Sequence, residues 1–126
     1  MKQVKYKGLT FVPYLENEKI QARIKEIGNQ ISQECKQTRP LFLCVLNGAF
    51  MFAADLMRRL TIDCQISFMK VASYEGTESF GRVKQLIGLN EEVKGRTVVL
   101  IEDIVDTGET MVMLTKQLKD LGAADV

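Results

Sequence analysis

Two adjacent carboxylates at the end of a short apolar run are the residues of this chain best placed to do chemistry. The apolar run 98–101 leads directly into Glu102 and Asp103, and a third acid, Asp106, follows after two apolar residues. Ionised carboxylates only accept hydrogen bonds, so this group suits sugar hydroxyls or a divalent cation. Because neighbouring side chains on an extended strand point to opposite faces, Glu102 and Asp103 are not expected to play the same role.

The polar turn that follows has the sequence Thr-Gly-Glu-Thr, at residues 107–110, and a helical apolar pattern begins at Met111. A strand that runs into a polar loop and then a helix is where open α/β sheets bind their ligands. The free N–H groups at the start of a helix favour a phosphate, and Gly108 permits its close approach. The segment 98–110 therefore predicts a site for a phosphorylated sugar.

This segment resembles the phosphoribosyl pyrophosphate motif of the type I phosphoribosyltransferases, and Asp106 resembles the acid typical of their 6-oxopurine branch. Asn47 and Gly48, within Leu-Asn-Gly-Ala-Phe, resemble the pyrophosphate loop of that branch, and Ser73 and Tyr74 resemble the conserved pair of its lid. The resemblance implies transfer of phosphoribose from phosphoribosyl pyrophosphate to hypoxanthine, or next to guanine, with Mg²⁺. It implies purine salvage, with a nucleoside monophosphate and pyrophosphate as products.

The resemblance also implies a role for each matching residue. Glu102 and Asp103 would meet the ribose hydroxyls, directly or through magnesium, and Asp106 would exchange a proton with N7 of the purine. The 5′-phosphate would lie in the turn after Asp106. The remaining substrate contacts implied are Ile104, Thr107, Gly108, Glu109 and Thr110. The peptide bond Leu46–Asn47 can be cis in this family.

Each of these motifs also has a simpler interpretation. The acidic pair could be a solvated strand end, Asp106 a turn former or helix cap, and Asn47-Gly48 an ordinary turn. Residues 73–82 could be a surface hairpin tip rather than a lid. Two rival functions stay open: a truncated, non-catalytic nucleotide-binding or regulatory relative, and another branch such as adenine or orotate transfer, which Asp106 disfavours.

Composition limits the alternatives further. The 126 residues support one domain, 1–126, and a net charge of +1 without a basic run does not indicate a nucleic-acid partner. No apolar stretch approaches the ~20 residues of a membrane span. Histidine is absent, which excludes His-dependent catalysis within these residues, and the three scattered cysteines indicate reduced thiols in a cytoplasmic protein.

Apolar periodicity predicts alternating helices and strands along the chain. Helices are expected at 16–37, 49–60 and 110–121, and strands at 41–46, 64–72, 83–89 and 97–101, with residues 1–15 partly extended. This order predicts an α/β fold with a parallel twisted sheet flanked by helices, the type I phosphoribosyltransferase fold. Against the family pattern, we expect the C-terminal strand and part of the hood to be missing. A homo-oligomer, dimer or tetramer, is also expected.

Overall fold

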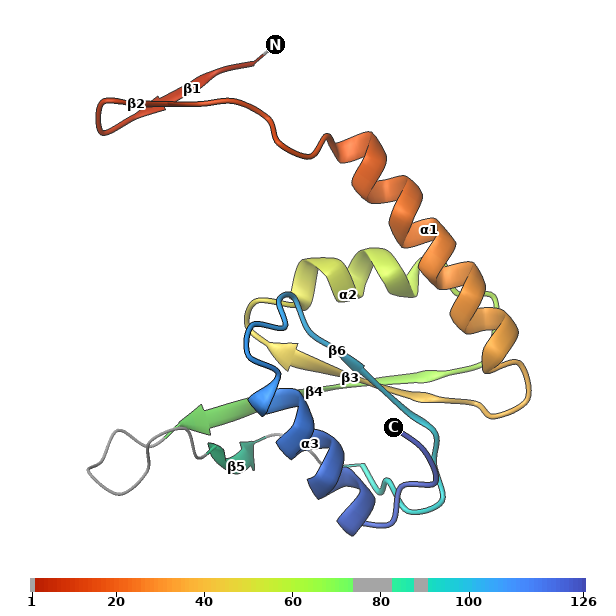
Figure 1. The fold of residues 1–126 in the computed structure, drawn as a ribbon. Coiled ribbons are helices and arrows are strands. Elements are labelled where there is room, and N and C mark those ends of the chain that lie inside the picture. The colour runs from red at the N-terminus through yellow and green to blue at the C-terminus, as the bar shows by residue number, and fades with distance from the viewer. Residues whose placement is uncertain (1, 74–82, 88–90) are drawn as a thin grey trace.

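The computed structural model describes residues 2–73, 83–87 and 91–126, which form three layers with a sheet between helices (Figure 1). The helices are α1 (Asn17–Glu34), α2 (Phe50–Met57) and α3 (Glu109–Asp120). The strands are β1 (Val4–Tyr6), β2 (Leu9–Phe11), β3 (Leu41–Leu46), β4 (Gln65–Ser73), β5 (Val83–Ile87) and β6 (Val98–Ile101).

The main sheet has the strand order β5-β4-β3-β6. Its central strand β3 runs parallel to both neighbours, β4 and β6, while β5 returns antiparallel on the outer edge of β4. The predicted fold class is therefore confirmed, and the strand predicted at 83–89 is the one that departs from the parallel direction. Because β3 and β6 are parallel neighbours, the loops that leave them emerge at the same end of the sheet.

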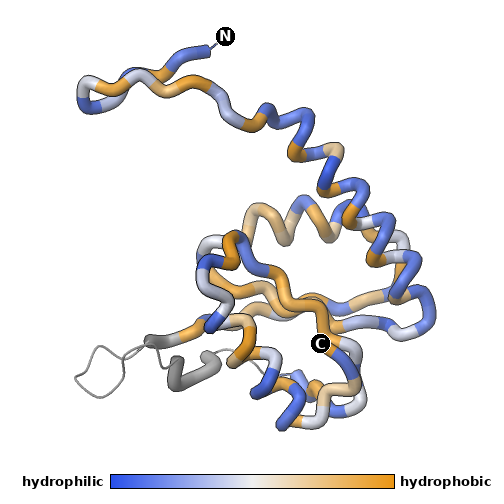
Figure 2. Tube along the Cα trace, in the orientation of Figure 1, coloured by the Kyte–Doolittle hydropathy of each residue, from blue (hydrophilic) through white to orange (hydrophobic). Residues whose placement is uncertain are grey.

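The burial of strand β3 accounts for the unbroken apolar run at 41–46. Alternate residues pack on opposite faces, so both sides of the strand are buried. Figure 2 shows the matching apolar colour along β3. One face contacts α3 through a cluster made of Leu41, Leu43, Val45, Met69, Val93, Val98, Leu114 and Leu118. The other contacts α1 and α2 through Ile24, Phe42, Cys44, Ala49, Ala53, Leu56 and Ile101.

Helix α1 covers the sheet with only part of its length. Ile24 is buried and packs in the second cluster, whereas Ile20, one turn earlier, remains 42% exposed. The helix ends at Glu34, three residues before the predicted end at 37, and Arg39 then takes a positive φ of 45° ahead of Pro40. The N-terminal part of α1 extends beyond the edge of the sheet and carries the β1–β2 hairpin away from it (Figure 1).

The β1–β2 hairpin is amphipathic. Its register pairs Val4 with Phe11 and Tyr6 with Leu9, which places these four apolar side chains on one face and the Lys5–Thr10 pair on the other. All four are at least half exposed. The turn is made by Lys7 and Gly8, both at positive φ. The hairpin agrees with the expectation that residues 1–15 are partly extended.

The chain leaves α3 through Gly122, whose φ of 95° is typical of a helix C-terminal cap. Asp125 then forms a parallel bridge with Thr97 beside β6, and Val98 donates its N–H to the Asp125 carbonyl at 2.9 Å. The alternation of helices and strands predicts the start of another strand at this point, and the bridge agrees with it. Over the described ranges, no helix combines the length and apolarity that crossing a membrane requires.

Candidate active site

The two loops singled out in the sequence meet at the carboxyl end of β3 and β6. The register places Cys44 opposite Ile101, so Glu102 and Asp103 leave the sheet close to where β3 ends at Leu46. The Leu46–Asn47 peptide bond is cis, as the resemblance implies. Asn47 and Gly48 lie at this edge, and α2 begins two residues later.

A small cavity of about 190 Å³ lies inside the loop between β6 and α3. Asp106 is exposed and belongs to its lining, together with the turn that is predicted to hold a phosphate. The lining residues are Glu102, Ile104, Val105, Asp106, Thr107, Gly108, Thr110 and Met111. The structure therefore brings six of the predicted site residues around one cavity, whereas Glu109 is exposed and does not belong to the lining.

The start of α3 directs backbone donors towards this loop. Gly108 precedes the helix at φ 85°, in the left-handed region, and an added Cβ there would meet no atom within 4 Å. The Thr107 hydroxyl oxygen accepts the Glu109 N–H at 3.3 Å, and Val112 donates to the Gly108 carbonyl at 3.0 Å. In the part of the chain that the structure describes, the N–H groups of Thr110 and Met111 are left without an acceptor, as expected at a helix start.

The two adjacent acids border different hollows, although their carboxyl groups lie close enough to hydrogen-bond to each other. Glu102 is half-buried and lines the small cavity, whereas Asp103 is exposed and borders a groove between α1 and α2. Desolvation raises the pKa of the Glu102 carboxyl above its usual range, and a hydrogen bond with Asp103 raises it further. The same hydrogen bond lowers the pKa of Asp103, and the Ile104 N–H assists by donating to Asp103 Oδ1 at 2.9 Å.

Asp103 also joins the two loops. A Cβ built on Gly48 would lie 2.8 Å from Asp103 Cγ, and the three atoms nearest to that position all belong to Asp103. The carboxylate therefore occupies the space beside Gly48 that a larger residue would need. This contact spans fifty-five positions of sequence and ties the loop after β3 to the loop after β6.

The predicted lid pair lies partly outside the described residues. Ser73 is the last residue of β4, while Tyr74 and residues 75–82 are not described. Two residues beyond the predicted set, Val105 and Met111, line the small cavity. Their position inside the motif, between the predicted acids and the first turn of α3, is the signal that could have identified them.

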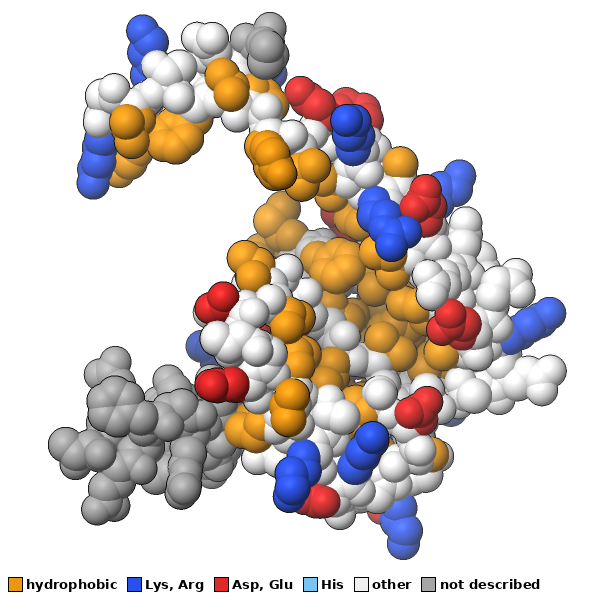
Figure 3. All heavy atoms as spheres, viewed as in Figure 1, with side chains coloured by type: hydrophobic (Ala, Val, Ile, Leu, Met, Phe, Trp, Pro, Cys, Tyr) orange, Lys and Arg blue, Asp and Glu red, His pale blue; other side chains and the backbone are white. Residues whose placement is uncertain are grey.

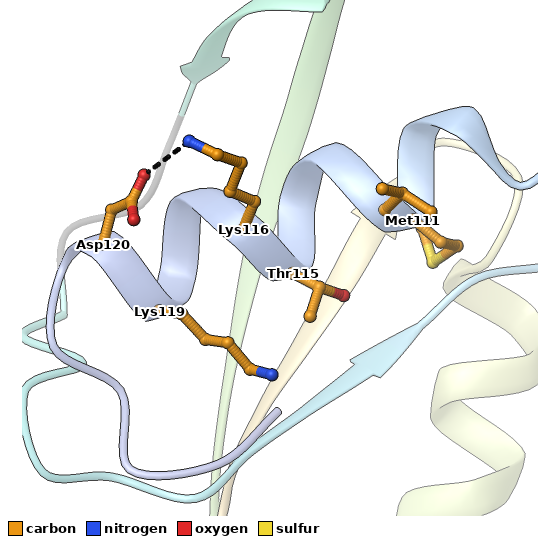
Figure 4. Close-up of a pocket in the computed structure, with 6 residues that line it drawn as sticks. Met111, Thr115, Lys116, Lys119 and Asp120 are labelled. Carbon is orange, nitrogen blue, oxygen red and sulfur yellow. Dashed lines mark hydrogen bonds and ion pairs between the residues drawn. The ribbon is translucent and has the colours of Figure 1, made fainter.

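Two larger hollows lie outside the small cavity. One, of about 520 Å³, runs along a single side of α3 (Figure 4), where Lys116 pairs with Asp120 at 3.2 Å. Its described lining comes from α3 alone, so it does not join separate elements at one point. The other, of about 510 Å³, lies between α1 and α2, where apolar side chains gather beside α1 (Figure 3). Among the described side chains, no group of three or more acids or cysteines forms a metal centre.

Comparison with known proteins agrees with the motif. The family model described as phosphoribosyl transferase domain matches residues 13–126. The hypoxanthine-guanine phosphoribosyltransferase of Streptococcus thermophilus is 39% identical over 110 residues, which are 86% of this chain and 61% of that protein. The chain thus spans about three fifths of the length of the curated relatives it matches first.

Solved structures share the fold at similar coverage. The hypoxanthine phosphoribosyltransferase of Staphylococcus aureus aligns with a TM-score of 0.77 at 33% identity, over 89% of this chain and 61% of that one. A variant of the Trypanosoma cruzi enzyme, solved in complex with its product IMP, aligns with a TM-score of 0.76 at 31% identity. That match covers 86% of this chain and 60% of the other.

Proposed function

This chain belongs to the phosphoribosyltransferase family, and from that premise we propose that it serves purine salvage as a 6-oxopurine phosphoribosyltransferase. The proposed reaction joins hypoxanthine, or guanine, to the phosphoribosyl group of phosphoribosyl pyrophosphate and gives IMP, or GMP, with pyrophosphate. The observation that carries the proposal is the small cavity beyond β6, where Asp106 and the start of α3 surround one space. The protein would act in the cytoplasm as a homo-oligomer.

The turn at 107–110 would hold the 5′-phosphate. The N–H groups of Thr110 and Met111 have no acceptor in the described part of the chain, and the open space above Gly108 admits a phosphate oxygen. Hydroxyl groups of Thr107 and Thr110 add donors at the same cavity. The dipole of α3 further favours a negative charge at this end.

Asp106 would act as the general acid–base. Its carboxylate lines the cavity that would hold the sugar phosphate, so a purine placed over the ribose lies within its reach. It would accept a proton from N7 as N9 bonds to the anomeric carbon, and return it in the reverse direction. A positioned carboxylate also stabilises the positive charge that develops at that carbon.

Glu102 and Asp103 would hold the ribose hydroxyls and a magnesium ion. Mg²⁺ binds through one or two carboxylates, keeps several waters and takes its other ligands from substrate phosphates. The two carboxylates at the end of β6 match this preference of Mg²⁺, and a third protein ligand is not required. When bound, the ion would neutralise charge on the departing pyrophosphate. Asn47 and Gly48 would contact that pyrophosphate through backbone N–H groups, and Ser73 and Tyr74 would belong to a lid.

The proposal is tested by ligand binding followed by turnover. Titration calorimetry of the protein with IMP, GMP and AMP should show binding of the two 6-oxopurine nucleotides and weaker binding of AMP. Turnover is then followed by chromatography with phosphoribosyl pyrophosphate, Mg²⁺ and either hypoxanthine, adenine or orotate. Equal affinity for AMP and IMP, or conversion of adenine in preference to hypoxanthine, would contradict the assignment to the 6-oxopurine branch.

A further inference from the structure

The glycine at position 48 is not required by its own backbone. Its φ lies outside the left-handed region, in contrast to Gly8, Gly95, Gly108 and Gly122, so an alanine could adopt the same conformation. What excludes a side chain is the neighbouring Asp103 carboxylate. The three nearest atoms to a Cβ at this position are its two oxygens and Cγ, the last at 2.8 Å.

The Asp103 carboxylate has a second fixed contact. Its Oδ1 accepts the N–H of the next residue, Ile104, at 2.9 Å, directly after β6. Moving the carboxylate away from Gly48 would lengthen or break this hydrogen bond. Because the carboxylate is the exposed end of a side chain, it can rotate away from an added methyl without disturbing the core.

From this geometry we propose that Gly48 is a positioning residue. Because it has no side chain, the Asp103 carboxylate keeps its position between the loop after β3 and the loop after β6. Gly48 thus acts through Asp103, in addition to any backbone contact of its own with the pyrophosphate. The functional part of this inference rests on the proposed function, in which Asp103 contacts the sugar or its metal ion. The structural part concerns only the position of the Asp103 carboxylate and does not rest on the proposed function.

The structural part is tested by amide hydrogen exchange at Ile104, measured by NMR without ligand. Gly48→Ala should speed exchange of this amide by about 5- to 10-fold, the factor that corresponds to one lost hydrogen bond. Gly95→Ala is the control for lost stability, because its φ of 73° strains an alanine although a Cβ there meets no atom within 4 Å, and it should leave exchange at Ile104 unchanged. Unchanged exchange at Ile104 in Gly48→Ala would overturn the proposal, since the carboxylate would then not have moved.

The functional part is tested by a double-mutant cycle on IMP affinity, measured by calorimetry. Gly48→Ala should weaken binding by about 10-fold or more, as expected for a displaced charged hydrogen-bond partner. In the Asp103→Ala background the same change should have no further effect, because no carboxylate remains to be displaced. If Gly48→Ala costs the same in both backgrounds, the glycine serves the ligand directly and the proposal is wrong.

Ile104 amide exchange and IMP affinity can fail independently. If the parent protein binds no nucleotide, the proposed function fails, yet exchange at Ile104 still decides whether Gly48 holds the Asp103 carboxylate in position. If the parent binds IMP and Ile104 exchange is unchanged, the function stands and the positioning role falls.

Discussion

Replacing Gly108 by alanine tests the phosphate site with a built-in control. Gly108 and Gly95 share two properties: both have positive φ, 85° and 73°, and a Cβ on either would meet no protein atom within 4 Å. A non-glycine residue in the left-handed region costs about 1–2 kcal/mol. Both variants should therefore lose similar stability, which corresponds to a fall in melting temperature of about 3 to 10 °C for a domain of this size.

The two variants should differ only in ligand binding. Gly108 lines the small cavity in which the phosphate is proposed to lie, so a methyl there is expected to crowd that phosphate, whereas Gly95 does not line the cavity. Loss of one charge-assisted hydrogen bond costs about 1.5–3 kcal/mol, so IMP should bind Gly108→Ala about 10- to 100-fold more weakly. Calorimetry measures the affinity and far-ultraviolet circular dichroism the melting. If both variants bind IMP like the parent, this turn does not hold the phosphate.

Two other substitutions test the acids. Asp106→Asn should slow the chemical step by about 10²–10⁴-fold, because the amide cannot accept a proton, while phosphoribosyl pyrophosphate affinity stays near that of the parent; equal single-turnover rates would remove Asp106 from catalysis. Glu102→Gln should raise stability at pH 7 in the presence of a chelator. The folded state raises the pKa of Glu102, so its stabilising protonated form is lost as pH rises through that pKa. The gain should therefore shrink towards pH 4, and a gain that does not vary with pH would show that the charge of Glu102 is not its cause.

The sheet and the phosphate turn could be predicted because their information is local. The run 41–46 is apolar without interruption, which is typical of a strand buried on both faces, and both faces of β3 are buried. The residues from Glu102 to Thr110 are nearly contiguous, so a strand end followed by a helix start necessarily collects them around one space.

The contact between Gly48 and Asp103 could not be predicted in the same way. It depends on the register of β3 against β6 and on the hydrogen bond from the Ile104 N–H to Asp103 after the strand, neither of which leaves a periodic signal. The N-terminal hairpin escapes prediction as a hairpin for a similar reason. Its turn residues, Lys7 and Gly8, both have positive φ, and Lys is not among the residues that favour the first position of such a turn.

The exposed hairpin has a consequence for how this protein can be observed. The chain contains no tryptophan. Two of its three tyrosines, Tyr6 and Tyr14, lie in the segment before α1, with exposed fractions of 62% and 94%. Their emission therefore already comes from a solvated environment in the native state. Loss of the packed sheet should change that signal little, whereas a partner that covered the apolar face around Tyr6 would change it strongly. Fluorescence from these two tyrosines thus reports on what contacts the segment before α1 rather than on the folding of the sheet.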